Sequence, residues 1–212
     1  QPGGLRTRLV VRGKRLVIRW RQLVIRWWRL QRRGREFRRR WRIGELVMNA
    51  GRILKHLFTP DWAVLRVFPG AVLKRIERAI KESEKSHIAE LRFAVEASLA
   101  LTPLLKGVTP RQRAHEVFAN LRVWDTEHNS GVLIYLQLVD RDIEIVADRG
   151  ISAKVGQGAW DAICRRMEEA FRTGRFEQGA LDGIREISEL LKLHFPPRGA
   201  NPDELPDRPV IL

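Results

Sequence analysis

The 212-residue sequence contains a single cysteine, a single tyrosine and no long apolar run. One cysteine rules out an internal disulfide and fits a reducing compartment. Cys164 lies at helical spacing from Trp160, Met167 and Phe171, so we expect it to fill the core rather than to act as a nucleophile. No stretch of about 18 uncharged apolar residues occurs and no secretory signal pattern is evident, so the sequence predicts no membrane-spanning helix.

Several motifs that define enzyme classes are also missing. There is no P-loop, no G-x-G-x-x-G after a predicted strand, no G-x-S-x-G and no cysteine–histidine pairing. The EF-hand ladder and a histidine pair at zinc spacing are absent as well. The sequence therefore names no catalytic residue, and any activity has to be inferred from other features.

The net charge of +15 is concentrated at one end of the chain. Of the 40 basic and 25 acidic side chains, 16 and 2 lie in residues 1–47, which leaves 24 and 23 for the remainder. Residues 48–212 therefore have the composition of an ordinary, nearly neutral globular protein, and the basic charge says nothing about their partners.

Residues 8–35 repeat with a period of seven, as RLVVRGK, RLVIRWR, QLVIRWW and RLQRRGR. Arginine pairs with phosphate and tryptophan favours the lipid–water interface, so this leader suits an anionic membrane surface. The residues expected to make that contact are Arg19, Trp20, Arg26, Trp27 and Trp28. Such a segment also binds other polyanions, including nucleic acid, but we expect no specific nucleic-acid recognition.

A second hypothesis for the leader is that it is not native. An exact seven-residue period is what a tandem repeat in the coding DNA would produce, and the ordinary composition begins near Met48. Residues 1–47 would then be an upstream extension and Met48 the native start. The intact mass of the protein from its own host decides between the two hypotheses.

Residues 48–195 carry the periodicity of regular structure. Residues 48–69 form an amphipathic arm, and apolar spacing predicts helices over about 69–84, 109–121, 159–173 and 176–194. Thr109, Pro110 and Gln112 form a capping box that starts the second of these helices. Leu91, Phe93 and Val95 alternate with polar residues and predict a strand. His87, near the end of the first of these helices, is expected at the surface. Residues 196–212 are rich in proline and are expected to be an extended or disordered tail.

The stretch from Val132 to Ala147 predicts a β-hairpin. An apolar run over 132–139 indicates a strand buried on both faces, Asp140-Arg141 makes a turn, and 142–147 alternates as the antiparallel partner. A helical crossover makes the first two strands parallel. The sequence therefore predicts an α/β fold, a small mixed sheet of three or four strands sandwiched by helices, within residues 70–195.

A polar loop precedes the hairpin, and the hairpin returns the chain to it. The loop and the returning strand bring together oxygen ligands that a hard cation such as calcium takes. The predicted ligands are Asp125, Glu127, His128, Asn129 and Asp148, with Arg149 as an anion contact. The alternative is a solvated turn in which Asp125 and Asn129 bond to their own backbone.

This segment resembles the TPM domain family, in the bacterial subgroup that keeps a D-T-E-H-N loop. The resemblance is carried by Val123-Trp124-Asp125, by Asn129-Ser130-Gly131-Val132-Leu133-Ile134, by the Asp140-Arg141 turn and by Glu144-Ile145 leading into Gly150-Ile151. It covers about residues 70–195. Better-known members have Trp-Gly at 124–125 and Gly-x-Gly at 148–150.

The resemblance implies an α/β sandwich and two functions. One is a non-catalytic, divalent-metal-binding module that assists membrane protein complexes, and the other is a metal-dependent acid phosphatase. We expect the first, with calcium or another divalent cation at the loop, an unidentified protein partner, and a cytoplasmic location or a peripheral one at the inner membrane face. A phosphomonoesterase at the same loop is the alternative; because no nucleophile is evident, a metal-bound water would have to attack.

Overall fold

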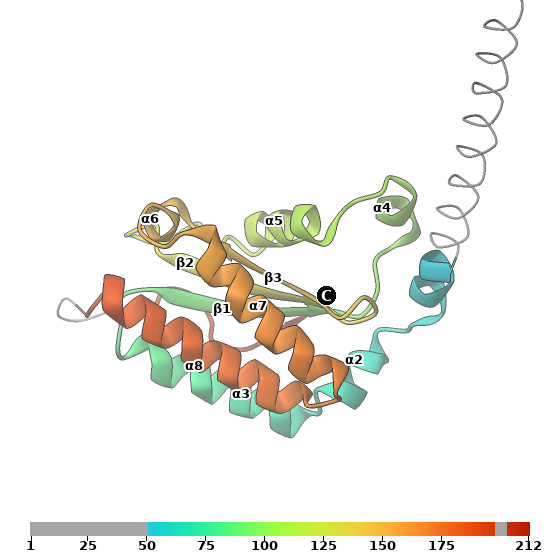
Figure 1. Cartoon of the computed structure of the whole chain (residues 1–212), viewed down its shortest axis with the longest axis horizontal. Helices are drawn as coiled ribbons and strands as arrows, with labels where there is room; N and C mark the ends of the chain where they lie inside the picture. Colours follow the sequence, from blue (N-terminus) through green and yellow to red (C-terminus); the bar gives the residue numbers. More distant parts are fainter. Residues whose placement is uncertain (1–50, 198–202) are drawn as a thin grey trace, which may run out of the picture. The chain divides into compact units, whose positions relative to one another are not determined.

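The computed structural model describes residues 51–197 and 203–212, so the predictions for Arg19, Trp20, Arg26, Trp27 and Trp28 lie outside the described residues. A helix over 51–58 opens the described chain. The elements that follow, labelled in Figure 1 except for β4, are α2 (Trp62–Val67), α3 (Gly70–Glu84), β1 (Glu90–Glu96), α4 (Leu101–Leu105), α5 (Pro110–Asn120), β2 (Gly131–Gln137), β3 (Asp142–Ala147), α6 (Arg149–Ser152), α7 (Gln157–Arg172), α8 (Phe176–His194) and β4 (Val210–Ile211).

The four strands form one mixed sheet in the order β3-β2-β1-β4. β1 and β2 are parallel, with Glu90 opposite Gly131, and β2 and β3 are antiparallel, with Val132 opposite Ala147. These pairings confirm the predicted crossover and hairpin. β4 adds a short parallel pairing at the free edge of β1, and it comes from the segment that the sequence suggested would be extended or disordered.

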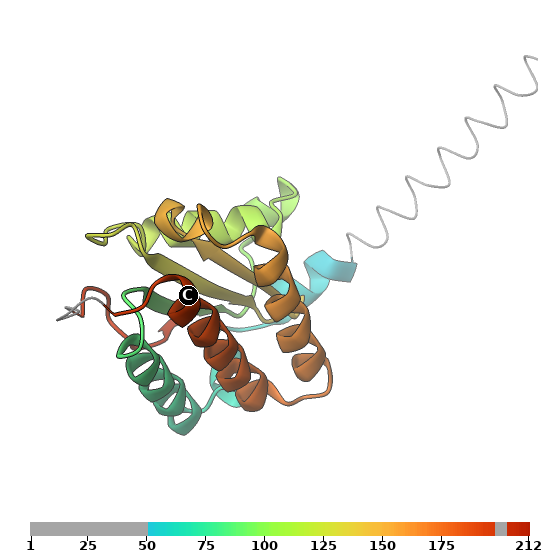
Figure 2. The ribbon, with the colours of Figure 1, turned by 60° about the vertical axis from the view of Figure 1, so that its left-hand side comes forward.

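Helices cover both faces of the sheet, as Figure 2 shows with α3, α8 and α7 along one side and α5 on the other. Alternate residues of β1 and β2 point to opposite faces, so Phe93 and Ile134 join the larger core while Ala94 and Leu133 join the smaller one. Both strands are buried at every position, as a central strand between two helical layers requires.

Local predictions within these layers are confirmed. Thr109 Oγ1 accepts from the Gln112 N–H at 3.2 Å and Gln112 Oε1 accepts from the Thr109 N–H at 2.9 Å, which is the predicted capping box. Cys164 is buried in the larger core, where burial raises the pKa of its thiol to about 12.

Within the described ranges no helix is long and apolar enough to cross a bilayer.

His87 is buried rather than at the surface, so that prediction is wrong. Its Nδ1 lies 3.0 Å from the carbonyl oxygen of Ala89. The end of α8 covers the turn between α3 and β1, where the Ile88 N–H donates to the carbonyl of Phe195 at 3.1 Å. A residue near a helix end is exposed only when no other element packs there, and the sequence does not show that packing.

The helix over 51–58 is attached to the sheet by a buried histidine. His56 Nδ1 accepts from the Leu99 N–H at 2.9 Å, so Nε2 carries the proton that it shares with Asp140 Oδ2 at 3.2 Å. Arg52 also donates to Asp140, at 2.7 Å. Burial lowers the pKa of His56, because a charged ring is poorly solvated there.

Candidate functional site

The polar residues of interest lie at one edge of the sheet, meaning the edge formed by strand ends and not by an outer strand. They precede β1 and β2 and follow β3. β1 and β2 are parallel and both begin at this edge, whereas the antiparallel β3 ends there. The Asp148 N–H donates to the carbonyl of Gly131 at 2.8 Å, and the Gly150 N–H donates to that of Asn129 at 3.2 Å. The predicted return of the chain to the polar loop is therefore confirmed.

Hydrogen bonds within the loop and with the residues that follow β3 stabilise the loop. Thr126 Oγ1 accepts from the Ser130 N–H at 2.8 Å. Arg149 Nε donates to Asn129 Oδ1 at 3.2 Å, so these two predicted site residues meet. Asp148 caps the short helix α6, with Oδ1 accepting from the Arg149 N–H at 2.7 Å. Its other oxygen, Oδ2, is buried without a hydrogen-bond partner among the described residues.

Asp125, Glu127 and His128 point their side chains to solvent. Across residues 51–197 and 203–212, these three and Asp148 do not form a group of three or more ligand atoms within 4.8 Å of one another. The loop ligand set therefore stays a prediction.

One acidic group does satisfy that distance, and it lies at the same edge of the sheet. One ligand oxygen from each of Glu84, Glu90 and Asp203 lies within 4.8 Å of the others. Glu84 ends α3, Glu90 begins β1, and Asp203 comes from the C-terminal segment, residues 203–212. Two of the three are buried and Asp203 is exposed, so the group opens to solvent on one side.

Backbone N–H groups hold the two buried carboxylates. Glu84 Oε1 accepts from the Leu91 N–H at 2.7 Å, and Glu90 Oε2 accepts from the Leu205 N–H at 3.3 Å. The remaining oxygen of Glu90, Oε1, is buried and has no hydrogen-bond partner in the described part of the chain, although Glu90 is only 1% exposed. A buried, unsatisfied carboxylate oxygen is costly, so it indicates a site that normally receives a proton or a cation.

The group has too little positive charge to balance it. Burial, with Glu90 and Asp207 nearby, raises the pKa of Glu84 to about 9. Burial, with Asp203 and Glu204 nearby, also raises the pKa of Glu90 to about 7. Arg92 is the neighbouring cation, yet its Nη1 donates to the backbone carbonyls of Pro206 and Arg208. Arg92 also lies near Glu84 and Asp207, and Lys81 near Asp207, so they offset part of the negative charge. Carboxylate oxygens are the ligands that calcium and magnesium take, so these residues fit a divalent cation.

The predicted loop lies beside this acidic group. The Glu127 N–H donates to Glu204 Oε2 at 2.9 Å, and Glu204 directly follows Asp203 in the chain. The sequence-predicted ligands therefore lie at the same edge of the sheet as the acidic group, but the sequence did not single out Glu84, Glu90 and Asp203. The available signals were a glutamate at the first position of a buried strand and three acids in the tail.

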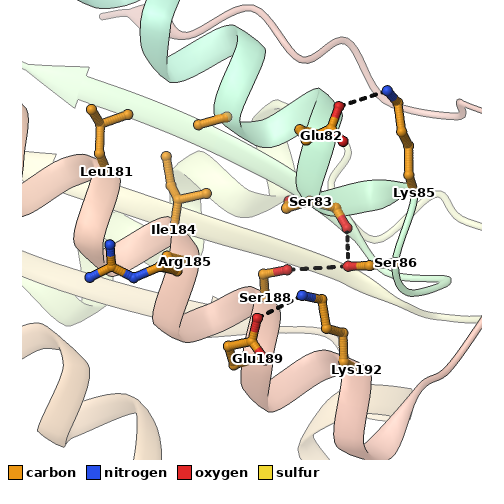
Figure 3. Close-up of a pocket in the computed structure, with 11 residues that line it drawn as sticks. Glu82, Ser83, Lys85, Ser86, Leu181, Ile184, Arg185, Ser188, Glu189 and Lys192 are labelled. Carbon is orange, nitrogen blue, oxygen red and sulfur yellow. Dashed lines mark hydrogen bonds and ion pairs between the residues drawn. The ribbon is translucent and has the colours of Figure 1, made fainter.

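A pocket of about 400 Å³ between α3 and α8 is a less suitable site (Figure 3). Ser86 Oγ donates to the backbone carbonyl of Ser83 at 2.6 Å there and lies 3.4 Å from Ser188 Oγ. Lys85 is paired with Glu82 and Lys192 with Glu189, each at 2.6 Å and on nearby turns. The lysines therefore do not present free charge to a ligand, and the lining includes no histidine or cysteine.

Comparisons with known proteins agree with this architecture. The family model described as the TPM domain matches residues 66–190. The NMR structure of the BA42 protein from the psychrophilic bacterium Bizionia argentinensis is 31% identical with a TM-score of 0.60, and the match covers 68% of this chain and 94% of that one. The N-terminal domain of a protein from P. gingivalis is 17% identical with a TM-score of 0.49, over 67% and 95%. No curated protein matches. The chain belongs to the TPM domain family.

Proposed function

We propose that this TPM domain is a module that binds a divalent cation through Glu84, Glu90 and Asp203. The observation that carries the proposal is the buried Oε1 of Glu90, which lacks a partner among the described residues and belongs to a trio of carboxylates within 4.8 Å. A cation would satisfy that oxygen and offset the repulsion within the trio.

Calcium suits the arrangement better than magnesium. Calcium accepts roughly six to eight oxygens in adaptable geometry, whereas magnesium requires a near-ideal octahedron. Two fixed carboxylates and one exposed aspartate leave room for water and for a further ligand from the neighbouring loop. In this proposal the further ligand comes from among Asp125, Glu127, His128, Asn129 and Asp148, and Arg149 offers an anion contact.

Calorimetric titration of the full chain with calcium tests the proposal. We expect saturable binding by the parent, and loss of at least about tenfold in affinity in Glu90→Gln and Asp203→Asn, since each removes a charged ligand. Glu189→Gln, which lies on α8 and pairs with Lys192, is the matched control and should bind as the parent does. Absence of binding by the parent overturns the proposal. Binding that survives both ligand variants but is lost in Asp125→Ala and Asp148→Ala moves the site to the loop.

A metal-dependent phosphomonoesterase is the second candidate. It is favoured by Arg149, whose guanidinium contacts Asn129 at the same edge and could hold a phosphate. The metal would supply an activated water, because no side chain of the described site is an evident nucleophile. Turnover of an aryl phosphate should then fall in both Glu90→Gln and Arg149→Ala, and activity that survives both variants rules out this site.

We further propose that the non-catalytic module acts on a protein partner, such as a membrane complex.

A further inference from the structure

The C-terminal segment, residues 203–212, is itself part of the candidate cation site. We infer that a bound cation acts as a clasp that fastens this segment to the sheet, so that cation binding and docking of β4 stabilise each other. This inference rests on the proposed function, because it requires a cation at Glu84, Glu90 and Asp203. It adds a structural consequence of binding that the proposed function does not include.

The first part of the segment is attached at the acidic group. Asp203 contributes one of the three ligand atoms, and the Leu205 N–H donates to Glu90 Oε2 at 3.3 Å. The Leu205 side chain is buried in the smaller core, beside Ala114 and Leu133. Backbone hydrogen bonds of Glu90 with Leu205 and Glu204, and the burial of Leu205, therefore position Asp203 next to its partners.

The rest of the segment has few attachments. Arg92 donates to two of its backbone carbonyls, those of Pro206 and Arg208. β4 pairs with β1 over two residues, Val210 opposite Ala94 and Ile211 opposite Val95, and the Leu212 N–H donates to the Val95 carbonyl at 2.9 Å. A two-residue edge strand is only marginally stable by itself, so small changes in free energy at the acidic group can decide whether it stays docked.

When the carboxyl groups are ionised and no cation is bound, their like charges oppose docking. The segment brings Asp203, Glu204 and Asp207 toward Glu84 and Glu90. Positive charge offsets this only in part: Arg92 lies near Glu84 and Asp207, and Lys81 Nζ is 3.9 Å from Asp207 Oδ2. Glu84 also shares a side-chain hydrogen bond with Asp207, whereas Asp207 Oδ1 is buried with no hydrogen-bond partner among the described residues. A divalent cation between the segment and the two glutamates converts this repulsion into attraction.

Cation binding and docking of the segment are thermodynamically linked, because one ligand, Asp203, belongs to the segment. Asp203 can join Glu84 and Glu90 only when the segment is docked, so the cation binds the docked state more tightly than the undocked one. The factor by which docking raises cation affinity must equal the factor by which the cation favours docking. Release of the cation would therefore loosen β4 and uncover the outer edge of β1, which β4 otherwise pairs.

Hydrogen exchange of the full chain, in calcium and in chelator, tests the clasp. The reporters are the amides of Leu205, which donates to Glu90, and of Leu212, which donates to Val95. We expect calcium to slow their exchange at least about fivefold, the lower range of allosteric coupling, and to leave amides of α7 unchanged. Asp203→Asn should remove the calcium effect, whereas Glu189→Gln should keep it.

A truncation that spares every proposed ligand tests the reciprocal effect. Deleting residues 209–212 removes β4, and we expect calcium affinity to fall, at most by the factor by which calcium protects the segment in the parent, because Leu205 and Arg92 still hold residues 203–208. Unchanged affinity contradicts the coupling to β4. Unchanged exchange of α7 amides verifies that the truncated chain is folded. Saturable calcium binding without any change in Leu205 and Leu212 exchange overturns the clasp and leaves the proposed function intact. Absence of calcium binding overturns both.

Discussion

Glu90 and Leu205 are 115 residues apart in the chain and joined by one hydrogen bond, from the Leu205 N–H to Glu90 Oε2 at 3.3 Å. The bond uses one carboxylate oxygen and leaves Oε1 buried without a partner within the described ranges. The same contact brings the C-terminal segment to the start of β1.

Glu90→Gln should stabilise the protein in chelator at about pH 8. Because one pKa unit corresponds to about 1.4 kcal/mol, a carboxyl pKa of about 7 makes the ionised form destabilising by on the order of 3 kcal/mol, and neutral glutamine removes much of that cost. The glutamine carbonyl can still accept from Leu205. Thermal unfolding should show a higher Tm in chelator and no gain from calcium. A lower Tm in chelator would show that the charge is compensated in a way that the structure does not reveal.

The stability of the cation-free protein should fall as the pH rises from about 5 toward 9. The pKa values of Glu90, about 7, and Glu84, about 9, are above the ordinary carboxyl value, so the folded state holds these protons more tightly than the unfolded state does. Urea unfolding in chelator across this range measures the effect. Calcium affinity should change in the opposite direction and rise with pH, because binding releases the protons.

Other groups also titrate over this range, so the comparison needs a matched variant. Burial raises the pKa of Asp142 to about 6, for example, and this residue is far from Glu90 in the sheet register. The difference in unfolding free energy between the parent and the double variant Glu84→Gln/Glu90→Gln isolates the two glutamates. A difference that does not vary with pH contradicts the prediction.

His56→Ala should detach the helix over 51–58 from the sheet. The substitution removes the acceptor of the buried Leu99 N–H and the partner of Asp140, and we expect a loss of about 2–4 kcal/mol in the free energy of unfolding. Chemical denaturation measures it, with the exposed His115→Ala as control. Because burial lowers the pKa of His56, the parent should also lose part of this contribution as the pH falls below the ordinary histidine range. Equal stability of the two alanine variants would be the contrary result.

Gly150→Ala should destabilise the fold at the predicted loop. A Cβ at this position would lie 2.6 Å from the carbonyl oxygen of Asn129 and 2.7 Å from that of His128, both of which are backbone atoms that cannot rotate away. We expect a loss of about 1–3 kcal/mol in urea unfolding, the usual cost of overpacking. Gly158→Ala is the control: its Cβ meets no atom within 4 Å in the described structure, and alanine in α7 should stabilise by about 0.5–1 kcal/mol. A Gly150→Ala variant as stable as the parent contradicts the close approach.

Elements with strong local patterns could be predicted from the sequence. The capping box at Thr109 and Gln112, the hairpin around Asp140 and the apolar stripes of α3, α7 and α8 depend on residues within a few positions of one another. Weaker local signals were missed: α4 and α6 have five and four residues and were not among the predicted helices. Short helices like these are determined by the contacts around them rather than by periodicity.

In the candidate site, too, local patterns predicted one part and tertiary contacts determined the other. The sequence determined that a polar loop and Asp148 meet at one edge of a mixed sheet, because strand direction and hairpin geometry fix which ends coincide. Only the tertiary structure decided that Glu84, Glu90 and Asp203 converge there, and that residues 203–212 add a fourth strand. The contacts of residues 203–212 with Glu90 and β1 join residues more than 100 positions apart, and their free energy comes from burial and charge that exist only after the chain has folded.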